Sequence, residues 1–530
     1  MRRLLPVLMF VGLWAGLCAG ADMPRLDKDH DEYHLIVDGK PYLIVGAQVH
    51  NSSGWPDTMA PLWPALNKLS ANTVMIPVYW EQLEPQPDTF DYSVVDGLLA
   101  GAREHHLHLA LLWFGTWKNG GMTYTPSWVK DDPKTYPRVQ TRDGLMVEAL
   151  SPLGQHSWER DGAALSKLMS HLKEVDGDQH TVILVQVENE AGVLGSDRDY
   201  SPEGDRAFAQ RVPDVVLRSL GLKTSGTWEQ VFSERAPEAF MAYHTAKYFQ
   251  QVASAGKAAY PLPFYINVWP REQPGLLRPG YSSPSGGAVA YLLPMWKALA
   301  PAIDIIGVDN YDTNPAPYFG LADLYSRPDN PLFIPETGGT VAHAKHMFEI
   351  FARPSALGIS CFGYNGSDLT QTATVKPPYS AVAIDYALVG PAAQMLLQLR
   401  DAHHLQAAIE EDGLANVPLL FDRYDAVARF GPVRSGYGGD RGQGNTDLSG
   451  RVLIGQIAPD EFLVIGVDAN VLFAPKLGHR GMASVVSVEE GSFVDGMWQR
   501  KRLLNGDETY FGLELGPEGT TLRVKFTLPQ

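Results

Sequence analysis

The chain has 530 residues, of which 45% are hydrophobic and 19% are charged, values that are typical of a folded globular protein and exclude a fibrous or disordered one. The length exceeds what one hydrophobic core usually supports, so more than one domain is expected. With 43 Lys and Arg against 60 Asp and Glu, the formal net charge is −17, which disfavours nucleic acid as a partner and favours a neutral ligand.

Residues 1–21 have the pattern of a secretory signal peptide. Arg2 and Arg3 precede an apolar stretch, which ends in small residues at Ala21. That stretch is shorter than the roughly 20 residues that span a bilayer, so cleavage is expected rather than anchoring. Cys361 would be the single cysteine of the mature chain, and no disulfide framework is expected. We therefore expect a periplasmic or secreted protein that has no membrane contact after signal cleavage.

Eight short apolar runs follow, each ending in polar or aromatic residues. They cover residues 42–51, 72–85, 107–117, 181–190, 263–272, 304–311, 331–339 and 359–368. Several intervening segments have the periodicity of amphipathic helices. Strands that are buried on both faces and alternate with helices form parallel sheets, and eight such units form a (β/α)8 barrel. The predicted fold class is therefore α/β, with a TIM barrel over residues 22–412.

The last part of the chain has a different pattern. A helix is expected over residues 390–413, where it would close the barrel. Beyond it, short alternating strands are separated by turn residues, which predicts an antiparallel β-sandwich over residues 413–530. Its expected role is to brace the barrel.

The active site of such a barrel is built from residues at the C-terminal ends of the strands. Here these ends are rich in carboxylates, amides and aromatic rings, where structural strand ends would hold ordinary turn residues. They hold His50-Asn51, Tyr79-Trp80, Trp113 with Trp117, Glu188-Asn189-Glu190, Asn267 with Trp269, Asp309-Asn310-Tyr311, Glu336 and Tyr364-Asn365. From these, the substrate-binding residues predicted are His50, Tyr79, Trp117, Trp269, Tyr311 and Tyr364, and the resemblance described below adds Asn189.

Glu190 and Glu336 are the predicted catalytic residues. They end the fourth and the seventh run, and these two strands face each other across the mouth of an eight-stranded barrel. Cleavage of a glycosidic bond with retention needs two carboxyl groups about 5–5.5 Å apart. Each glutamate alone could instead cap a helix or form an ion pair. Two of them on opposed strands, with no Lys or Arg beside either, favour catalysis.

Several candidates have a structural alternative. Trp117 and Trp269 could stack on sugar rings or could pack in the core. Tyr311 could hydrogen-bond Glu336 or could serve packing, and His50 could line the pocket or hold a loop. Glu188 is expected on the same strand face as Glu190, one step deeper in the barrel, where it would support its neighbours.

No metal or other cofactor is expected. The pairs His105-His106 and His403-His404 lie in helical segments, where adjacent residues point about 100° apart and chelate poorly. The sequence contains no HExxH motif and no GxSxG motif, so neither a zinc site nor a serine nucleophile is indicated.

Three segments resemble glycoside hydrolase family 35, the β-galactosidases, within the clan of retaining (β/α)8 glycosidases. They are residues 72–92, the motif VENEAG at 187–192 and the motif IPETGG at 334–339. The resemblance implies that Glu190 is the acid/base, that Asn189 binds the sugar 2-hydroxyl and that Glu336 is the nucleophile. It also implies a supporting role for Glu188.

The chain departs from this family at the third strand end. Many members have an acidic sugar-binding residue there, whereas residues 113–119 of this chain read WFGTWKN. The short C-terminal region is similar to a compact bacterial branch, some members of which act on galactosylated xyloglucan.

The expected function is hydrolysis of terminal β-galactosyl residues of oligo- or polysaccharides by double displacement. One alternative is another retaining glycosidase of the clan, a β-mannosidase, β-glucosidase or endo-glycanase, which would keep both glutamates. The other is a non-catalytic carbohydrate-binding barrel, which would lack one of them. The aglycone and the oligomeric state stay open.

Overall fold

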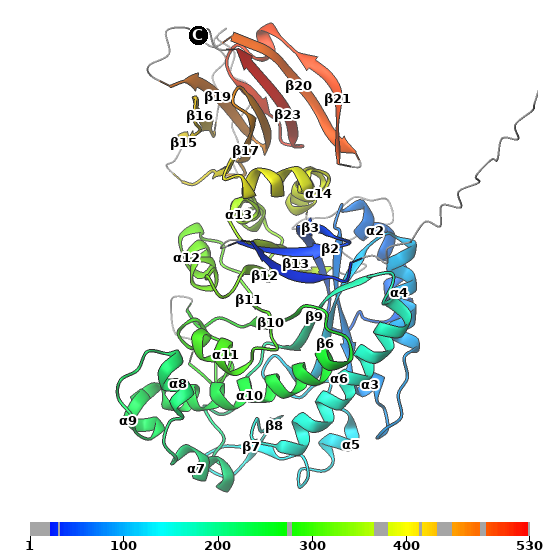
Figure 1. Cartoon of the computed structure of the whole chain (residues 1–530), viewed down its shortest axis with the longest axis vertical. Coiled ribbons are helices and arrows are strands. Elements are labelled where there is room, and N and C mark those ends of the chain that lie inside the picture. The colour runs from blue at the N-terminus through cyan, green and yellow to red at the C-terminus, as the bar shows by residue number, and fades with distance from the viewer. Residues whose placement is uncertain are drawn as a thin grey trace, which may run out of the picture.

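The computed structural model describes residues 22–29, 32–272, 278–364, 380–412, 416–431, 448–476, 484–494 and 496–527. The predicted signal peptide, residues 1–21, and the end of the eighth apolar run lie outside the described residues. The molecule is elongated, with a helix-wrapped barrel at one end and antiparallel sheets at the other (Figure 1). Helix α14 (Ser380–Asp401) lies between the two parts.

Eight parallel strands form the barrel, in chain order around the sheet. They are β4 (Ile44–Val49), β5 (Thr73–Tyr79), β6 (His108–Lys118), β9 (Val182–Asn189), β10 (Phe264–Val268), β11 (Ile305–Val308), β12 (Leu332–Thr337) and β13 (Ala356–Tyr364). Each apolar run of the sequence overlaps one strand, and the last strand pairs with the first. The predicted fold class is confirmed.

The barrel is joined between β11 and β12 by side chains and a single bridge rather than by a continuous ladder. The Asn310 backbone N donates to the Glu336 backbone carbonyl at 2.9 Å. At the other end of the gap, the Asn330 side chain accepts from the Ile306 amide N and donates to the Ile306 carbonyl. This seam places the last residues of both strands at the mouth.

Among the described residues, six helices cover the outside of the barrel: α4 (Ser93–Glu104), α6 (Gln155–Asp176), α10 (Ala236–Ala259), α11 (Leu293–Leu299), α12 (Pro315–Tyr325) and α13 (Val341–Ala352). Helices α6 and α10 lie side by side. A Cβ at Gly162 of α6 would come within 3.3 Å of the Ala255 Cβ of α10, so glycine permits the close approach.

The connections at the C-terminal ends of the strands carry shorter elements. These are α1 (Pro56–Met59), α2 (Trp63–Lys68), α3 (Trp80–Leu83), α5 (Ser127–Lys130), α7 (Pro202–Phe208), α8 (Asp214–Ser219), α9 (Trp228–Phe232) and the hairpin of β7 (Arg138–Gln140) and β8 (Met146–Leu150). The longest connections follow β6 and β9, the third and fourth barrel strands.

A small antiparallel sheet, which the sequence patterns did not predict, precedes the barrel. It consists of β1 (Arg25–Asp29), β2 (Glu32–Val37) and β3 (Lys40–Tyr42). Leu35 and Val37 of β2 share a buried cluster with residues at the starts of the barrel strands, such as Ile44 and Leu357. The sheet therefore covers the N-terminal end of the barrel and leaves the opposite end for the site.

Two antiparallel sheets form the C-terminal part. The larger contains β14 (Leu405–Ile409), β17 (Arg451–Ala458), β18 (Glu461–Val467), β23 (Thr520–Thr527), β20 (Ser484–Val494) and β21 (Met497–Leu504). The smaller contains β15 (Asn416–Leu420), β16 (Tyr424–Arg429), β19 (Ala469–Pro475) and β22 (Leu513–Leu515). Apolar residues of both sheets share one buried cluster, which is the core of a β-sandwich.

The helix expected over residues 390–413 is confirmed over 390–401 and is wrong beyond that point. Helix α14 ends at Asp401, and residues 405–409 form strand β14, which pairs with β17 of the larger sheet. The apolar residues of this short segment fit a strand as well as a helix, because periodicity alone cannot distinguish them over five residues. The domain boundary at residue 413 stays a prediction.

Within the described ranges, α14 is the one helix that is long and apolar enough to cross a membrane by length and composition. Its side chains instead join the two parts of the molecule. The Tyr386 hydroxyl donates to the Gly46 carbonyl of β4, and the Asp385 carboxylate accepts from Arg451 of β17. We therefore interpret α14 as a core helix.

Candidate active site

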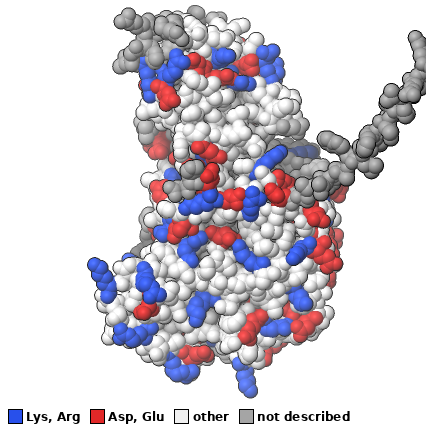
Figure 2. Space-filling model, in the orientation of Figure 1, with Lys and Arg blue, Asp and Glu red and all other residues white. Residues whose placement is uncertain are grey.

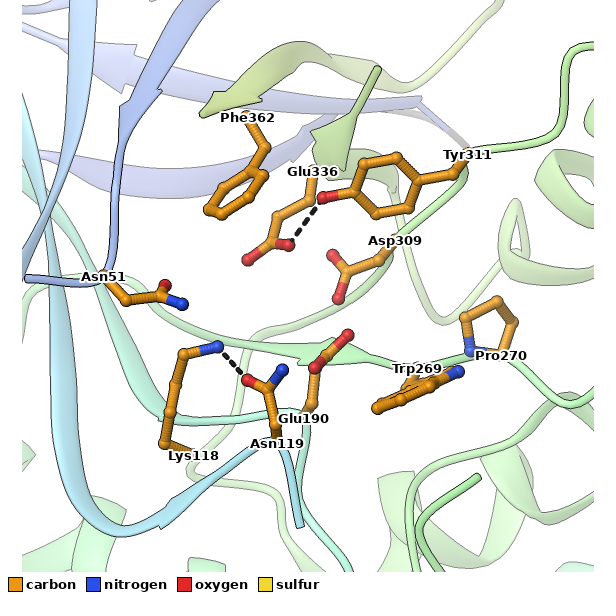
Figure 3. Close-up of a pocket in the computed structure, with 10 residues that line it drawn as sticks. All are labelled: Asn51, Lys118, Asn119, Glu190, Trp269, Pro270, Asp309, Tyr311, Glu336 and Phe362. Carbon is orange, nitrogen blue, oxygen red and sulfur yellow. Dashed lines mark hydrogen bonds between the residues drawn. The ribbon is translucent and has the colours of Figure 1, made fainter. Parts of the chain in front are cut away.

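The C-terminal ends of the barrel strands surround a pocket of about 330 Å³ (Figure 3). Its walls come from residues that are far apart in the sequence but share this end of the barrel. They are Asn51, Lys118, Asn119, Glu190, Trp269, Pro270, Asp309, Tyr311, Glu336 and Phe362. Three carboxyl groups and one ammonium group therefore line the same cavity.

The Glu336 carboxylate, at the end of β12, accepts hydrogen bonds from four side chains. Gln48 Nε2 donates to its Oε1 at 2.7 Å and the Tyr311 hydroxyl donates to its Oε2 at 2.9 Å. The side-chain nitrogens of Asn189 and Asn267 lie 3.4 Å from Oε1. Four donors around one buried carboxylate satisfy its oxygens and fix their direction toward the pocket.

Glu190 follows β9, with 8% of its surface exposed, and its backbone N donates to Asn267 Oδ1 at 3.0 Å. Burial raises its pKa to about 7, and the charge of Glu336 acts in the same direction. The ammonium group of Lys118 opposes both effects and lowers the pKa. A carboxyl group with a pKa near 7 can hold a proton and release it at neutral pH, as a general acid/base must.

Asp309 is a third acid in the pocket. It is buried and its Oδ2 accepts from Asn267 Nδ2 at 2.7 Å. Burial, followed by the charges of Glu336 and Glu190, raises its pKa well above the ordinary value. Asp309 therefore holds a proton more readily than an ordinary aspartic acid does.

One carboxylate oxygen from each of Glu190, Asp309 and Glu336 lies within 4.8 Å of the other two. This spacing is close to the 5–5.5 Å that separates the carboxyl groups of retaining glycosidases, and it is shorter than the 6.5–9.5 Å of inverting ones. By spacing alone the three acids could also hold a cation. However, the N–H and O–H donors of Gln48 and Tyr311 occupy Glu336, so the set fits proton transfer better than metal ligation.

Glu188 does not lie on the same face as Glu190, so that expectation was wrong. Its Oε2 accepts from the Trp117 backbone N at 2.7 Å, outside the barrel wall. Side chains at i and i+2 share a face only in a regular strand. Glu188 and Glu190 both have positive φ, +62° and +46°, and this backbone conformation interrupts the alternation. The structure therefore gives Glu188 a position behind the site.

The predicted sugar-binding residues Asn189, Trp269 and Tyr311 lie at the pocket. Trp269 and Tyr311 line it directly, with Tyr311 39% exposed. Asn189 is buried behind the lining and reaches Glu336 through its side-chain nitrogen. Figure 3 shows Trp269 and Tyr311 on the same side of the cavity as Asp309.

Tyr79 and Trp117 do not line the pocket. The Tyr79 hydroxyl donates to the Asn51 carbonyl at 2.8 Å and accepts from the Gly54 backbone N, so it holds the loop that carries Asn51. Trp117 is buried against Tyr248 and Phe249 of α10. Its indole therefore packs against α10 rather than in the pocket.

His50 and Tyr364 also lie outside the pocket lining. The His50 side chain is exposed, and its ring contacts the edge of Phe362, which does line the pocket. Tyr364 is fully buried in the barrel core at the end of β13. Sequence position at a strand end places a residue near the mouth, but it does not give the direction of the side chain.

Sequence reasoning did not select Gln48, Asn267 and Asp309. Asn267 and Asp309 were recognised as strand-end residues, yet nothing set them apart from their neighbours. Gln48 carried a usable signal, because a polar residue inside the buried run 42–51 must find a hydrogen-bond partner. Its partner is Glu336.

Residues 34–263 match the family model described as Glycosyl hydrolases family 35. Over these residues the chain is similar to glycoside hydrolase family 35. The match includes Glu190 and the strands β4 to β9, whereas Glu336 lies beyond the matched residues. Residues 382–516 match a second model, described as a domain of unknown function, DUF5597, which covers most of α14 and of the C-terminal sheets.

Two curated relatives match about a third of this chain each. A beta-galactosidase of Xanthomonas manihotis is 29% identical over 194 residues, which are 34% of this chain and 29% of that protein. The beta-galactosidase-1-like protein 3 of Homo sapiens is 26% identical over 202 residues, 36% of this chain and 28% of that protein. The aligned part thus spans less than a third of each relative. Among solved structures, a beta-galactosidase from Bacillus circulans sp. alkalophilus has a TM-score of 0.48 at 13% identity, covering 67% of this chain and 57% of that one.

Proposed function

We propose that the protein is a retaining β-galactosidase that removes terminal β-galactosyl residues by double displacement. The observation that carries the proposal is the geometry of Glu190 and Glu336. They are two buried carboxyl groups from opposed strands, with oxygens within 4.8 Å of each other. The similarity to family 35 and the relatives named as beta-galactosidases favour galactose as the sugar.

In the first step, Glu336 Oε attacks the anomeric carbon and forms a covalent ester. The bond from that carbon to the leaving oxygen breaks, and Glu190 gives its proton to this oxygen. Glu336 suits the attack because Gln48 and Tyr311 hold its carboxylate oxygens in place, and Glu190 suits the proton transfer because its pKa is about 7.

In the second step, Glu190 acts as the base. Once Glu336 is esterified its charge is gone, so one cause of the raised pKa of Glu190 disappears and Glu190 stays ionised. It accepts a proton from water, the resulting hydroxide oxygen attacks the anomeric carbon, and the ester to Glu336 breaks. Two inversions give a product with the original β configuration.

An exo mode of action is part of the proposal. The pocket volume of about 330 Å³ lies at the small end of the range for ligand sites, which suits one terminal sugar residue better than a chain that passes through. The natural substrates would be galactosylated oligo- or polysaccharides, xyloglucan side chains among them. The protein would act in the periplasm or outside the cell, as its N-terminal sequence suggests.

Paired substitutions test the catalytic assignment. Glu190→Gln and Glu336→Gln are expected to lower turnover of nitrophenyl β-galactoside by more than about 100-fold, since each removes one participant in the proton or covalent step. In Glu336→Gly, azide is expected to restore turnover of the nitrophenyl substrate and to give an α-configured product. Full activity of either carboxamide variant would contradict the assignment.

The alternative sugars are separated by a panel of nitrophenyl glycosides. A β-galactosidase would turn over the galactoside fastest, whereas a β-mannosidase or β-glucosidase of the same clan would prefer its own sugar. An endo-glycanase would release oligosaccharides, and a non-catalytic barrel would release nothing. Product analysis on galactosylated xyloglucan oligosaccharides, β-1,4-galactan fragments and lactose then compares the aglycones.

A further inference from the structure

Lys118 supplies the only ammonium or guanidinium group among the residues that line the described pocket. The residue is 8% exposed and is the last residue of β6. Its Nζ donates to Asn189 Oδ1 at 2.7 Å and also to Asn119 Oδ1 (Figure 3 shows the second bond). A buried ammonium group needs such partners, and both partners here are neutral amides.

A bulge in β6 brings Lys118 opposite Asn189. The parallel register pairs Trp113 with Val187, and the next pair is Lys118 with Asn189. Residues 114–117 of β6 therefore stand opposite the single residue Glu188 of β9. Without this bulge, regular pairing would have placed residue 115, a glycine, opposite Asn189.

Buried carboxyl groups behind the barrel wall hold this bulge. Glu188 Oε2 accepts from the Trp117 backbone N, and Asp161 of α6 accepts from Trp113 Nε1 and Thr116 Oγ1, each at 2.8 Å or less. A Cβ at Gly115 would lie 2.8 Å from both Asp161 Oδ1 and Glu188 Oε1, so only glycine fits between the two acids. The position of Lys118 is thus set by the fold and not by the exposed surface.

An amide side chain has a donating end and an accepting end, whereas an ammonium group only donates. Lys118 therefore binds the oxygen of Asn189, and the Asn189 nitrogen turns toward Glu336, 3.4 Å away. We propose that Lys118 is a positioning residue that fixes the Asn189 amide with its nitrogen toward the sugar hydroxyl next to the anomeric carbon. This inference rests on the proposed function and assigns the site to sugars with a free 2-hydroxyl.

The charge of Lys118 has a second effect that a purely structural residue would not have. The groups that face it across the pocket are Glu190, Asp309, Glu336 and Tyr311. Of these, Glu190 is the proposed acid/base, and Lys118 lowers its pKa. Loss of the positive charge would therefore move the alkaline limb of the pH–activity profile to higher pH.

The test compares Lys118→Met, which removes donors and charge at similar length, with Lys118→Arg, which keeps both. Activity is measured on nitrophenyl β-galactoside and on its 2-deoxy analogue, from pH 5 to 9. For Lys118→Met we expect a loss of about 10–100-fold in kcat/KM on the galactoside, the size of one lost charge-assisted hydrogen bond. On the 2-deoxy analogue, which cannot use the Asn189 contact, the loss is expected to be less than about 3-fold. Lys118→Arg is expected to keep the pH profile of the wild type.

Equal losses on both substrates would overturn the proposal, and so would an unchanged activity of Lys118→Met. Thermal unfolding of each variant shows whether it is folded; if Lys118→Met is unstable, Lys118→Leu, which also removes donors and charge, replaces it. Activity of the wild type on nitrophenyl β-galactoside tests the proposed function separately. If it hydrolyses another β-glycoside, the same comparison is made with the 2-deoxy analogue of that sugar.

Discussion

At the scale of single residues, the site depends on three acids in one cavity whose environments differ. Glu336 is surrounded by donors, Asp309 is buried beside two other acids, and Glu190 has both a neighbouring acid and the ammonium group of Lys118. Environments that separate the pKa values of neighbouring acids also assign their roles. The sequence predicted two of these acids but did not predict their neighbours.

The raised pKa of Glu190 predicts a pH dependence of both activity and stability. Activity should fall above about pH 7 as Glu190 loses its proton. The folded-state pKa of about 7 exceeds the ordinary 4.5, so the stability that Glu190 contributes is complete below pH 4.5 and is lost as the pH rises to about 7. At pH 8, the free energy of unfolding of Glu190→Gln should therefore exceed that of the wild type by roughly 3 kcal/mol. The variant should accordingly have the higher melting temperature.

The corresponding measurement is thermal unfolding of both proteins at pH 5 and pH 8, together with the pH profile of kcat/KM. At pH 5 the two melting temperatures should lie much closer together than at pH 8. If the difference in melting temperature between the wild type and Glu190→Gln is the same at pH 5 and pH 8, the raised pKa is contradicted.

At the scale of secondary structure elements, the bulge of β6 is the feature that sequence patterns missed. Residues 107–117 read as one continuous buried strand, and their apolar pattern gives no sign that 114–117 lie opposite a single residue. The cause is distant in sequence, since Asp161 and Glu188 hold the bulge. The start of each barrel strand could be predicted from local apolar runs, whereas this register depends on tertiary contacts.

Glu188 supplies a prediction for this element. Burial and the charge of Asp161 raise the pKa of Glu188 well above its ordinary value, so its carboxyl group keeps a proton. Glutamine imitates a protonated carboxyl group, and Glu188→Gln should retain activity within about 3-fold of the wild type. Glu188→Ala removes the acceptor of the Trp117 backbone N and should lower the free energy of unfolding by about 1–3 kcal/mol.

Kinetics of Glu188→Gln beside Glu190→Gln, with thermal unfolding of Glu188→Ala, decide this point. The two glutamates are two residues apart, so the pair is a matched control. A loss in Glu188→Gln as large as that in Glu190→Gln would mean that Glu188 takes part in the chemistry.

At the scale of the whole molecule, helix α14 links the barrel to the C-terminal sheets. Asp385 of α14 and Arg451 of β17 form a fully buried ion pair, with the Arg451 Nε 2.7 Å from Asp385 Oδ1.

The surface on the side shown in Figure 2 carries interspersed acidic and basic residues rather than one large patch. The architecture of both parts could be predicted from strand and helix patterns. The covering sheet β1–β3 and the strand β14 could not, because short edge strands carry weak periodic signals.

The buried pair supplies the prediction for this scale. Arg451→Met leaves the Asp385 charge buried without its partner, which should lower the free energy of unfolding by about 3–5 kcal/mol. The double variant Asp385→Leu/Arg451→Met removes both charges and should recover most of that loss. Activity at 25 °C should be unchanged in both, since neither residue lines the pocket.

Thermal unfolding of the two variants and the wild type measures the effect. If the double variant is as unstable as Arg451→Met, then packing rather than the unpaired charge is responsible. A loss of activity in a folded variant would indicate that the C-terminal part acts on the site.

The central claim is that Glu336 forms a bond to the sugar, and trapping that bond tests it most directly. A 2-deoxy-2-fluoro-β-galactosyl fluoride slows the second step more than the first, so the sugar accumulates on the nucleophile, and peptide mass spectrometry locates it. We predict one sugar per chain, on the peptide that contains Glu336, and none in Glu336→Gln. A label on Glu190 or Asp309, or no label on a protein that turns over the galactoside, would contradict this account.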